Sequence, residues 1–256
     1  MADNDAASPA VPRRPESALA LVLAGGSGRR LLDLTASRAK AAIPFAGHYR
    51  AIDFPLSNCV NSQIRRIAVL TQYKSQSLIR HVSSGWGFLH RELDEYIEIW
   101  PAQQRDGERW YSGPADAVYQ NLDLIEAAGP DHVVVLAGDQ LYTLDYAEVI
   151  DEHAANDADV TVACVETPTA LARPFNVAAI DAERRIHSFG ARSRGRMPPF
   201  GAPGMTLVAM GVYVFSTDFL FARLNARAAH AAPQADFAST VLPEACTSRV
   251  WKRAFM

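Results

Sequence analysis

The residues best suited to chemistry lie in Leu21–Leu31, where an apolar run leads into glycines and arginines. These glycines and cations are Gly25, Gly26, Gly28, Arg29 and Arg30. Glycines permit positive φ angles, and successive N–H groups in such a loop can form an anion-binding concavity. The arginines add bidentate donors for phosphate. The segment therefore favours phosphate binding, and a turn without a ligand is the alternative.

Neither of two better-known phosphate-binding patterns fits this loop. The dinucleotide fingerprint needs a third glycine where Leu31 stands. The P-loop needs Gly-Lys-Ser/Thr, which is absent from this segment.

A second candidate is Asp139, which follows the apolar run Val133–Ala137 and one glycine. Ligands of parallel sheets bind at the carboxyl ends of the strands. A carboxylate at such an end could hold Mg²⁺ together with phosphate oxygens. The alternative is a turn aspartate that caps the next helix.

Two further segments could contact a base. Tyr111 offers a stacking face and a hydroxyl, and Gly113 allows close approach just before a predicted helix. Gln103 and Gln104 carry amides of the kind that read the edge of adenine. The alternatives are a plain loop-to-helix junction and a solvated loop.

Short apolar runs alternate with helical periodicity over the first two thirds of the chain, which is typical of a central parallel sheet. The predicted strands are Ala18–Ala24, Arg66–Thr71, Val133–Ala137 and Val160–Val165. The predicted helices are Ser75–Ser84, Ala115–Ala128 and Asp145–Asn156, with Asp116 and Asp145 as helix starters. This order predicts an α/β fold with a doubly wound, mostly parallel sheet.

The pattern changes after Asp181. A short strand is expected within Arg184–Phe189, and an exposed loop over Ala191–Gly204. Met205–Phe215 predicts another strand, followed by a helix from Thr217 and a short helical piece before the end.

Composition bounds the class of protein. The chain has 256 residues, 49% of them hydrophobic, which suffices for one large or two small domains. A net charge of -3 argues against general nucleic-acid binding, and no apolar run approaches the roughly 20 residues of a membrane span. The three cysteines fit neither a disulfide framework nor a metal spacing, so we expect a reduced, cytoplasmic setting. Residues 1–17 are expected to form a disordered tail.

Seven ordered segments resemble the bacterial glucose-1-phosphate adenylyltransferases and together cover roughly residues 18–242. They are LVLAGGSGRRL, LTASRAKAAIPFAGHYRAIDFPLSNCVNS, VLTQYKSQSLIRHV, PAQQR, RWYSGPADAV, VVVLAGDQLYTLDY and MGVYVF. The resemblance implies a Rossmann-like nucleotidyltransferase domain over residues 18–256. It implies transfer of AMP from ATP to glucose 1-phosphate, with release of pyrophosphate and with Mg²⁺ as cofactor.

The resemblance also implies roles for individual residues. The glycine loop and Arg30 would hold the triphosphate, with Lys40 near the phosphates. Gln103 or Gln104 would contact adenine. Tyr111 and Gly113 would help form the pocket, and Asp139 would bind the metal.

Several positions depart from the family pattern. Arg192 stands where a lysine usually meets the sugar phosphate, Ala191 replaces a glutamate, and Ala209 replaces a serine. Arg29 takes a place usually held by threonine. We therefore expect weak binding of glucose 1-phosphate.

The resemblance further implies that the family's second metal aspartate and its C-terminal β-helix would lie beyond residue 256 of this sequence. The alternative hypothesis is a non-catalytic nucleotide-binding paralogue. Such a chain could form a homo- or hetero-oligomer, or act as the regulatory partner of a full-length homologue.

Overall fold

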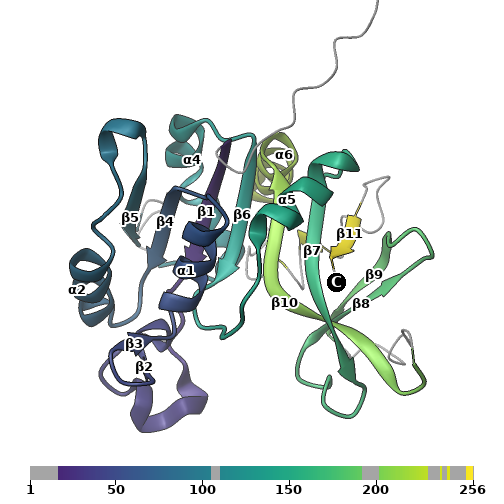
Figure 1. Cartoon of the computed structure of the whole chain (residues 1–256), viewed down its shortest axis with the longest axis horizontal. Coiled ribbons are helices and arrows are strands. Elements are labelled where there is room, and N and C mark those ends of the chain that lie inside the picture. The colour runs from purple at the N-terminus through teal and green to yellow at the C-terminus, as the bar shows by residue number, and fades with distance from the viewer. Residues whose placement is uncertain are drawn as a thin grey trace, which may run out of the picture.

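The computed structural model describes residues 17–104, 110–191, 202–229, 237, 241–242 and 252–255. Within them, nine strands join in one sheet whose main path is β11-β7-β10-β6-β1-β4-β5, with β8 and β9 attached beside β10 (Figure 1). These strands are β1 (Ala18–Leu23), β4 (Arg66–Thr71), β5 (Tyr96–Pro101), β6 (His132–Ala137), β7 (Val160–Pro168), β8 (Asn176–Ile180), β9 (Ile186–Ala191), β10 (Met205–Ser216) and β11 (Lys252–Phe255). A separate pair is formed by β2 (Pro44–Phe45) and β3 (Tyr49–Arg50).

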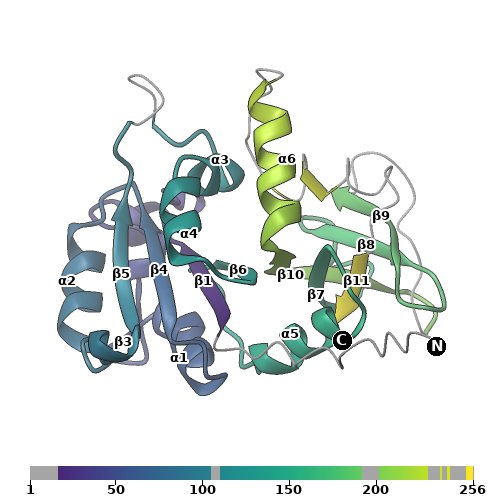
Figure 2. The ribbon, with the colours of Figure 1, turned by 90° about the horizontal axis from the view of Figure 1, so that it is seen from above.

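Helices cover both faces of the sheet, as the alternation of strands and helices predicted. The α-helices are α1 (Asp53–Asn61), α2 (Gln76–Gly85), α3 (Pro114–Tyr119), α4 (Leu122–Ala128), α5 (Tyr146–Ala155) and α6 (Thr217–Ala229). The 3-10 helices are η2 (Arg29–Thr35), η3 (Lys40–Ala42) and η4 (Arg91–Leu93). In Figure 2, α3, α4 and α6 lie on one side of the sheet, and α1 and α5 lie on the other.

The sheet is mostly parallel, which confirms the predicted fold class. Neighbours β6, β1, β4 and β5 pair in parallel. The exception on the main path is β10, which runs antiparallel to both β6 and β7. The strand predicted at Val160–Val165 is therefore present, but its expected parallel pairing is only half right, because one of its two neighbours is antiparallel.

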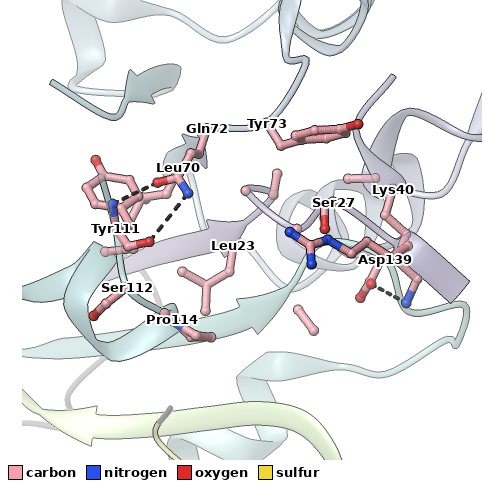
Figure 3. A pocket seen from close by; sticks show the side chains of 18 residues that line it. Leu23, Ser27, Lys40, Leu70, Gln72, Tyr73, Tyr111, Ser112, Pro114 and Asp139 are labelled. Atoms are coloured by element: carbon pink, nitrogen blue, oxygen red, sulfur yellow. Dashed lines mark hydrogen bonds and ion pairs between the residues drawn. The ribbon is translucent and has the colours of Figure 1, made fainter. Parts of the chain in front are cut away.

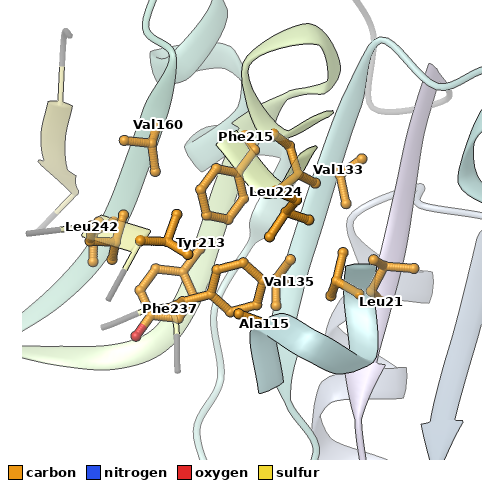
Figure 4. Packing of buried hydrophobic residues seen from close by; sticks show 14 of the residues in the cluster. Leu21, Ala115, Val133, Val135, Val160, Tyr213, Phe215, Leu224, Phe237 and Leu242 are labelled. Carbon is orange, nitrogen blue, oxygen red and sulfur yellow. The ribbon is translucent and has the colours of Figure 1, made fainter. Parts of the chain in front are cut away.

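Alternating side chains of the central strands build two apolar layers. From β1, Leu19 and Leu21 face one layer, and Ala18, Ala20 and Val22 face the other. All five are fully buried. Figure 4 shows the layer under α3 and α6, where residues of β6, β10 and α6 pack together. Burial on both faces explains why these strands are apolar throughout.

The single helix predicted over Ala115–Ala128 is wrong, because two helices occupy this range. They part at Gln120 and Asn121. The Asn121 Nδ2 donates to the Ala117 carbonyl at 2.8 Å. The Asn121 backbone N–H, which would bond to that carbonyl in a continuous α-helix, donates to the Val118 carbonyl. A side chain that takes the carbonyl four residues back competes with helix continuation.

Other predictions hold at the level of whole elements. The structure has helices at Gln76–Gly85 and Tyr146–Ala155, and Asp145 caps the latter by accepting the Ala147 N–H at 2.9 Å. Of the predicted tail, only Ser17 is described, and its carbonyl accepts the Asp131 N–H at 3.1 Å. In the part of the chain that the structure describes, no helix is both long and apolar enough to cross a bilayer.

Candidate functional site

The carboxyl ends of β1, β4 and β6 meet at one edge of the sheet and carry the glycine loop, Gln72 and Asp139. Gly138 allows this approach. A Cβ atom at Gly138 would stand 2.9 Å from the Leu23 carbonyl oxygen, which accepts the Gly138 N–H at 3.0 Å. A side chain there would push β6 away from β1, so glycine keeps Asp139 beside the loop.

Lys40 is held beneath the glycine loop by contacts of the backbone. Its N–H donates to the Gly26 carbonyl at 3.3 Å. Gly28 has a φ of 60°, and a Cβ atom there would lie 3.1 Å from the Lys40 Cβ and 2.9 Å from the Thr35 Cγ2. The loop and Lys40 thus form one packed unit, in which Gly28 supports Lys40.

Buried Asp53 anchors the chain that follows Lys40. Its carboxylate accepts the Arg50 N–H at 2.8 Å and the Trp86 indole N–H at 2.8 Å, and it lies 2.7 Å from His81 Nε2. Burial lowers the pKa of the Arg50 guanidinium, and neighbouring Arg38 lowers it further. This network holds the chain at the start of α1, where the Ile52 N–H also donates to the Ala41 carbonyl of η3 at 3.0 Å.

A cavity of about 520 Å³ opens at this edge of the sheet. It is lined by Leu23, Ala24, Gly25, Gly26, Ser27, Arg29, Lys40, Ala41, Leu70, Gln72, Tyr73, Tyr111, Ser112, Gly113, Pro114, Ala117, Ala137 and Asp139. Figure 3 shows its two ends: Leu70, Tyr111 and Pro114 lie toward one, and Ser27, Lys40 and Asp139 toward the other. An apolar, aromatic end beside a charged end suits a ligand with a base and phosphates.

The charged end contains an ion pair between Lys40 Nζ and Asp139 Oδ2, with side chains 35% and 26% exposed. Asp139 does not cap the next helix, because Asp145 does. Among the described residues, no three His, Cys, Asp or Glu side chains gather into a metal-binding group. A lone carboxylate fits a Mg²⁺ ion that takes its remaining ligands from phosphates and water, as Mg²⁺ commonly does in nucleotide sites.

Tyr111 is fixed at the other end by two side chains. Gln72 Oε1 accepts the Tyr111 N–H at 2.8 Å, and Gln72 Nε2 donates to the Tyr111 carbonyl at 3.4 Å. Asn121 Nδ2 donates to the Tyr111 hydroxyl at 2.9 Å. The residue that breaks the predicted long helix therefore also positions the tyrosine. Asp116 lies in the first turn of α3 and accepts the Ser112 N–H at 2.7 Å.

The structure brings most of the predicted site residues together. Gly25, Gly26, Lys40, Tyr111, Gly113 and Asp139 all line the cavity. Gln103 and Gln104 lie exposed just past β5, outside the lining. Arg30 is also exposed outside the lining, and Arg192 lies outside the described residues.

Sequence reasoning did not single out Ser27, Gln72 or Tyr73 as lining residues. Gln72 directly follows β4, so the rule that ligands bind at strand ends could have found it. Tyr73 comes next in the same turn. Arg29 was noted as a cation of the loop, but the role implied by the resemblance went to Arg30.

The second half of the sheet meets this edge through β10. Its pairing with β7 shifts between Ala209 and Tyr213, which marks a bulge. Gly211 in the bulge has a φ of 71°, and a Cβ atom there would lie 3.0 Å from the Ala137 Cβ. Ala209 precedes the bulge and is only partly buried. The bulge therefore brings this half close to the strand end that carries Asp139.

A mostly parallel sheet with a glycine loop and a cavity at its strand ends is typical of nucleotide-binding α/β proteins. The chain belongs to the nucleotidyl transferase family, whose sequence pattern matches residues 19–255.

Among its relatives are three bacterial proteins named as glucose-1-phosphate adenylyltransferases. The one from Paramagnetospirillum magneticum is 50% identical over 231 residues, 90% of this chain and 54% of the relative. The one from Thiobacillus denitrificans is 52% identical over 226 residues, 88% of this chain and 52% of the relative. Glucose-1-phosphate adenylyltransferase 1 from Alkalilimnicola ehrlichii is 50% identical over 236 residues, 92% of this chain and 56% of the relative. The chain thus spans about half the length of these curated relatives.

Proposed function

We propose that this chain transfers AMP from ATP to glucose 1-phosphate, giving ADP-glucose and pyrophosphate. The observation that carries the proposal is the two-ended cavity, which has an aromatic wall at one end and the glycine loop, Lys40 and Asp139 at the other. Membership in the nucleotidyl transferase family and the names of the relatives support the same reaction.

In this proposal, the chain positions two phosphate groups and lowers their mutual repulsion. The N–H groups at Gly25, Gly26 and Gly28, with Arg30, hold the triphosphate. Lys40 stabilises negative charge near the α-phosphorus. Holding the sugar phosphate in line with that phosphorus removes most of the entropic barrier. Mg²⁺ held by Asp139 would offset charge on the leaving pyrophosphate.

The base and the sugar phosphate have separate sites in the proposal. Tyr111 and Gly113 form the wall for the nucleoside, and Gln103 or Gln104 reads the edge of adenine. Arg192 takes the sugar phosphate. Its guanidinium carries the charge of a lysine but differs in shape and donor geometry. Ala191 and Ala209 offer no polar side chain to the sugar. These two alanines favour the second candidate function, nucleotide binding without turnover.

A coupled assay of pyrophosphate release tests the proposal with ATP, glucose 1-phosphate and Mg²⁺. We expect release that requires all three. If ATP binds but no pyrophosphate appears, the non-catalytic alternative holds. Absence of ATP binding at millimolar concentration by the folded protein would refute both.

Calorimetry on the Arg30→Ala variant tests the assigned phosphate contact. Loss of a hydrogen bond to a charged ligand should weaken ATP binding by about 1.5–3 kcal/mol. An unchanged affinity would remove Arg30 from the site.

A further inference from the structure

The charges in the cavity are unevenly paired. Its charged lining residues are Arg29, Lys40 and Asp139. Lys40 and Asp139 neutralise each other in their ion pair. Among the described residues, Arg29 forms no ion pair, although its side chain reaches a cavity that contains a carboxylate. One unneutralised guanidinium therefore faces this space, and it favours an anionic ligand.

The local backbone explains why Arg29 and Arg30 differ. Gly28 adopts the left-handed conformation, with φ 60° and ψ 32°, and turns the chain into η2. The Leu31 N–H donates to the Gly28 carbonyl at 2.8 Å, which closes the first turn. Successive residues of a 3-10 helix point about 120° apart, because three residues complete a turn. The side chains of Arg29 and Arg30 therefore leave the backbone in different directions, and Arg29 is the one that lines the cavity.

We infer that Arg29 binds the polyphosphate chain of the nucleotide and makes the cavity prefer triphosphates to monophosphates. The inference rests on the proposed function, and it adds a phosphate contact at Arg29 to the one proposed for Arg30.

The contact has the right chemistry for this end of the cavity. A guanidinium is always charged at neutral pH and offers a planar pair of donors that matches two phosphate oxygens. Ser27 and the loop backbone lie in the same lining. Each additional phosphate adds negative charge opposite Arg29, so the effect should grow from AMP to ATP. The other end of the cavity is lined by Tyr111 and Leu70, and binding of the nucleoside there should not depend on Arg29.

Calorimetry with three probes tests the inference: inorganic tripolyphosphate, ATP and AMP. The variants are Arg29→Ala, Arg29→Lys and Arg29→Thr. Arg80→Ala serves as a matched loss of charge at an exposed α2 residue outside the lining. We expect Arg29→Ala and Arg29→Thr to bind tripolyphosphate and ATP roughly ten- to hundredfold more weakly, with AMP changed less than threefold. Arg29→Lys should fall between them and the parent chain. Melting temperatures should agree, because the side chain is exposed.

Several outcomes overturn the inference. They are equal loss of AMP and ATP affinity, an Arg80→Ala effect as large as that of Arg29→Ala, unchanged ATP affinity in Arg29→Ala, or no binding of tripolyphosphate by the parent chain. The inference and the proposed function fail separately. Tight tripolyphosphate binding that depends on Arg29, without pyrophosphate release in the assay, supports the inference and refutes turnover. Turnover that is insensitive to Arg29 does the reverse.

Discussion

The two halves of the sheet contribute to the candidate site in different ways: one through its backbone, the other through individual side chains. In the half built from β1, β4, β5 and β6, the backbone itself sets the site. Gly138 abuts the Leu23 carbonyl, and Lys40 is bonded to Gly26. In the half built from β7 to β11, the expected sugar contacts are individual side chains, and two of them are alanine. Side-chain contacts can be lost without disturbing a strand, whereas Gly28 and Gly138 of the first half cannot gain a side chain without moving their neighbours.

We expect the largest effect from a substitution of Asp139 in the half built from β1, β4, β5 and β6, which we call the nucleotide half. Asp139→Asn keeps the shape but removes the charge that pairs with Lys40 and would hold the metal. We expect turnover to fall roughly 10²-fold or more. ATP binding should lose its dependence on Mg²⁺, while the melting temperature changes little. Titration of ATP with and without Mg²⁺ checks this result, with Asp151→Asn on α5 as an exposed control. An intact Mg²⁺ dependence in Asp139→Asn would contradict the assigned role.

The next largest effect is expected from restoring the sugar contacts in the half built from β7 to β11. The combined substitutions Ala191→Glu, Arg192→Lys and Ala209→Ser restore the family's pattern at these three positions. Each recovered hydrogen bond to a charged ligand is worth about 1.5–3 kcal/mol, so kcat/KM for glucose 1-phosphate should rise roughly tenfold to several hundredfold. ATP affinity should stay constant. Steady-state kinetics measures both, with Ala170→Ser as a neutral control. An unchanged kcat/KM would show that these positions do not limit the use of glucose 1-phosphate.

Gly138→Ala tests whether the backbone fixes the nucleotide half. The new methyl group would stand 2.9 Å from a backbone oxygen, which cannot rotate away as a side chain does. We expect a loss of about 1–3 kcal/mol in the free energy of unfolding and a melting temperature several degrees lower. Gly26→Ala is the matched control, since nothing lies within 4 Å of its added Cβ atom. Equal melting temperatures of the two variants would count against the close approach.

Gln72→Ala probes the nucleoside wall more gently. It removes both hydrogen bonds to the Tyr111 backbone. Loss of this support should weaken ATP binding about three- to tenfold, since a typical hydrogen bond contributes about 0.5–1.5 kcal/mol. Calorimetry can compare it with Gln76→Ala, an exposed glutamine of α2. If Gln72→Ala weakened the binding of tripolyphosphate more than that of ATP, Gln72 would act at the phosphate end of the cavity, which would contradict this prediction.

The smallest expected effect is a pH-dependent change in stability caused by Asp159, just before β7 in the second half of the sheet. Burial raises the pKa of the Asp159 carboxyl, and nearby Asp157 raises it further. Because the folded state disfavours the ionised form, Asp159 costs stability as the pH rises above the ordinary carboxyl pKa of about 3.9, and the cost is complete above its raised pKa. Asp159→Asn should therefore be slightly more stable than the parent at pH 7, and this gain should disappear below about pH 4. Thermal melts at both pH values measure the difference. A gain that persists in acid would contradict this account.

Periodicity and strand-end reasoning predicted the parallel half well. Arg66–Thr71 is a strand with the predicted bounds, because its buried faces leave an unbroken apolar run. Asp139 and Tyr111 entered the cavity as predicted, since each follows or precedes an element that the sequence defines. The break at Asn121 could not be predicted, because it depends on a side chain that turns back to Ala117 and on to Tyr111.

Two features also escaped prediction because they depend on distant parts of the chain. The direction of β10 depends on which strands it joins. Arg29, and not Arg30, lines the cavity after the left-handed turn at Gly28. Neither feature can be predicted from the local amino-acid composition.

The antiparallel strand between the halves has a consequence for synthesis of the chain. Leu136 of β6 pairs with Val212 of β10, far along the sequence. During translation, the first half therefore emerges with one edge of a valine-rich strand uncovered until β10 leaves the ribosome. Such an edge can pair with another nascent chain and nucleate aggregation. Slow passage through the codons between these strands should lower the soluble yield more than the same delay placed after Ser216.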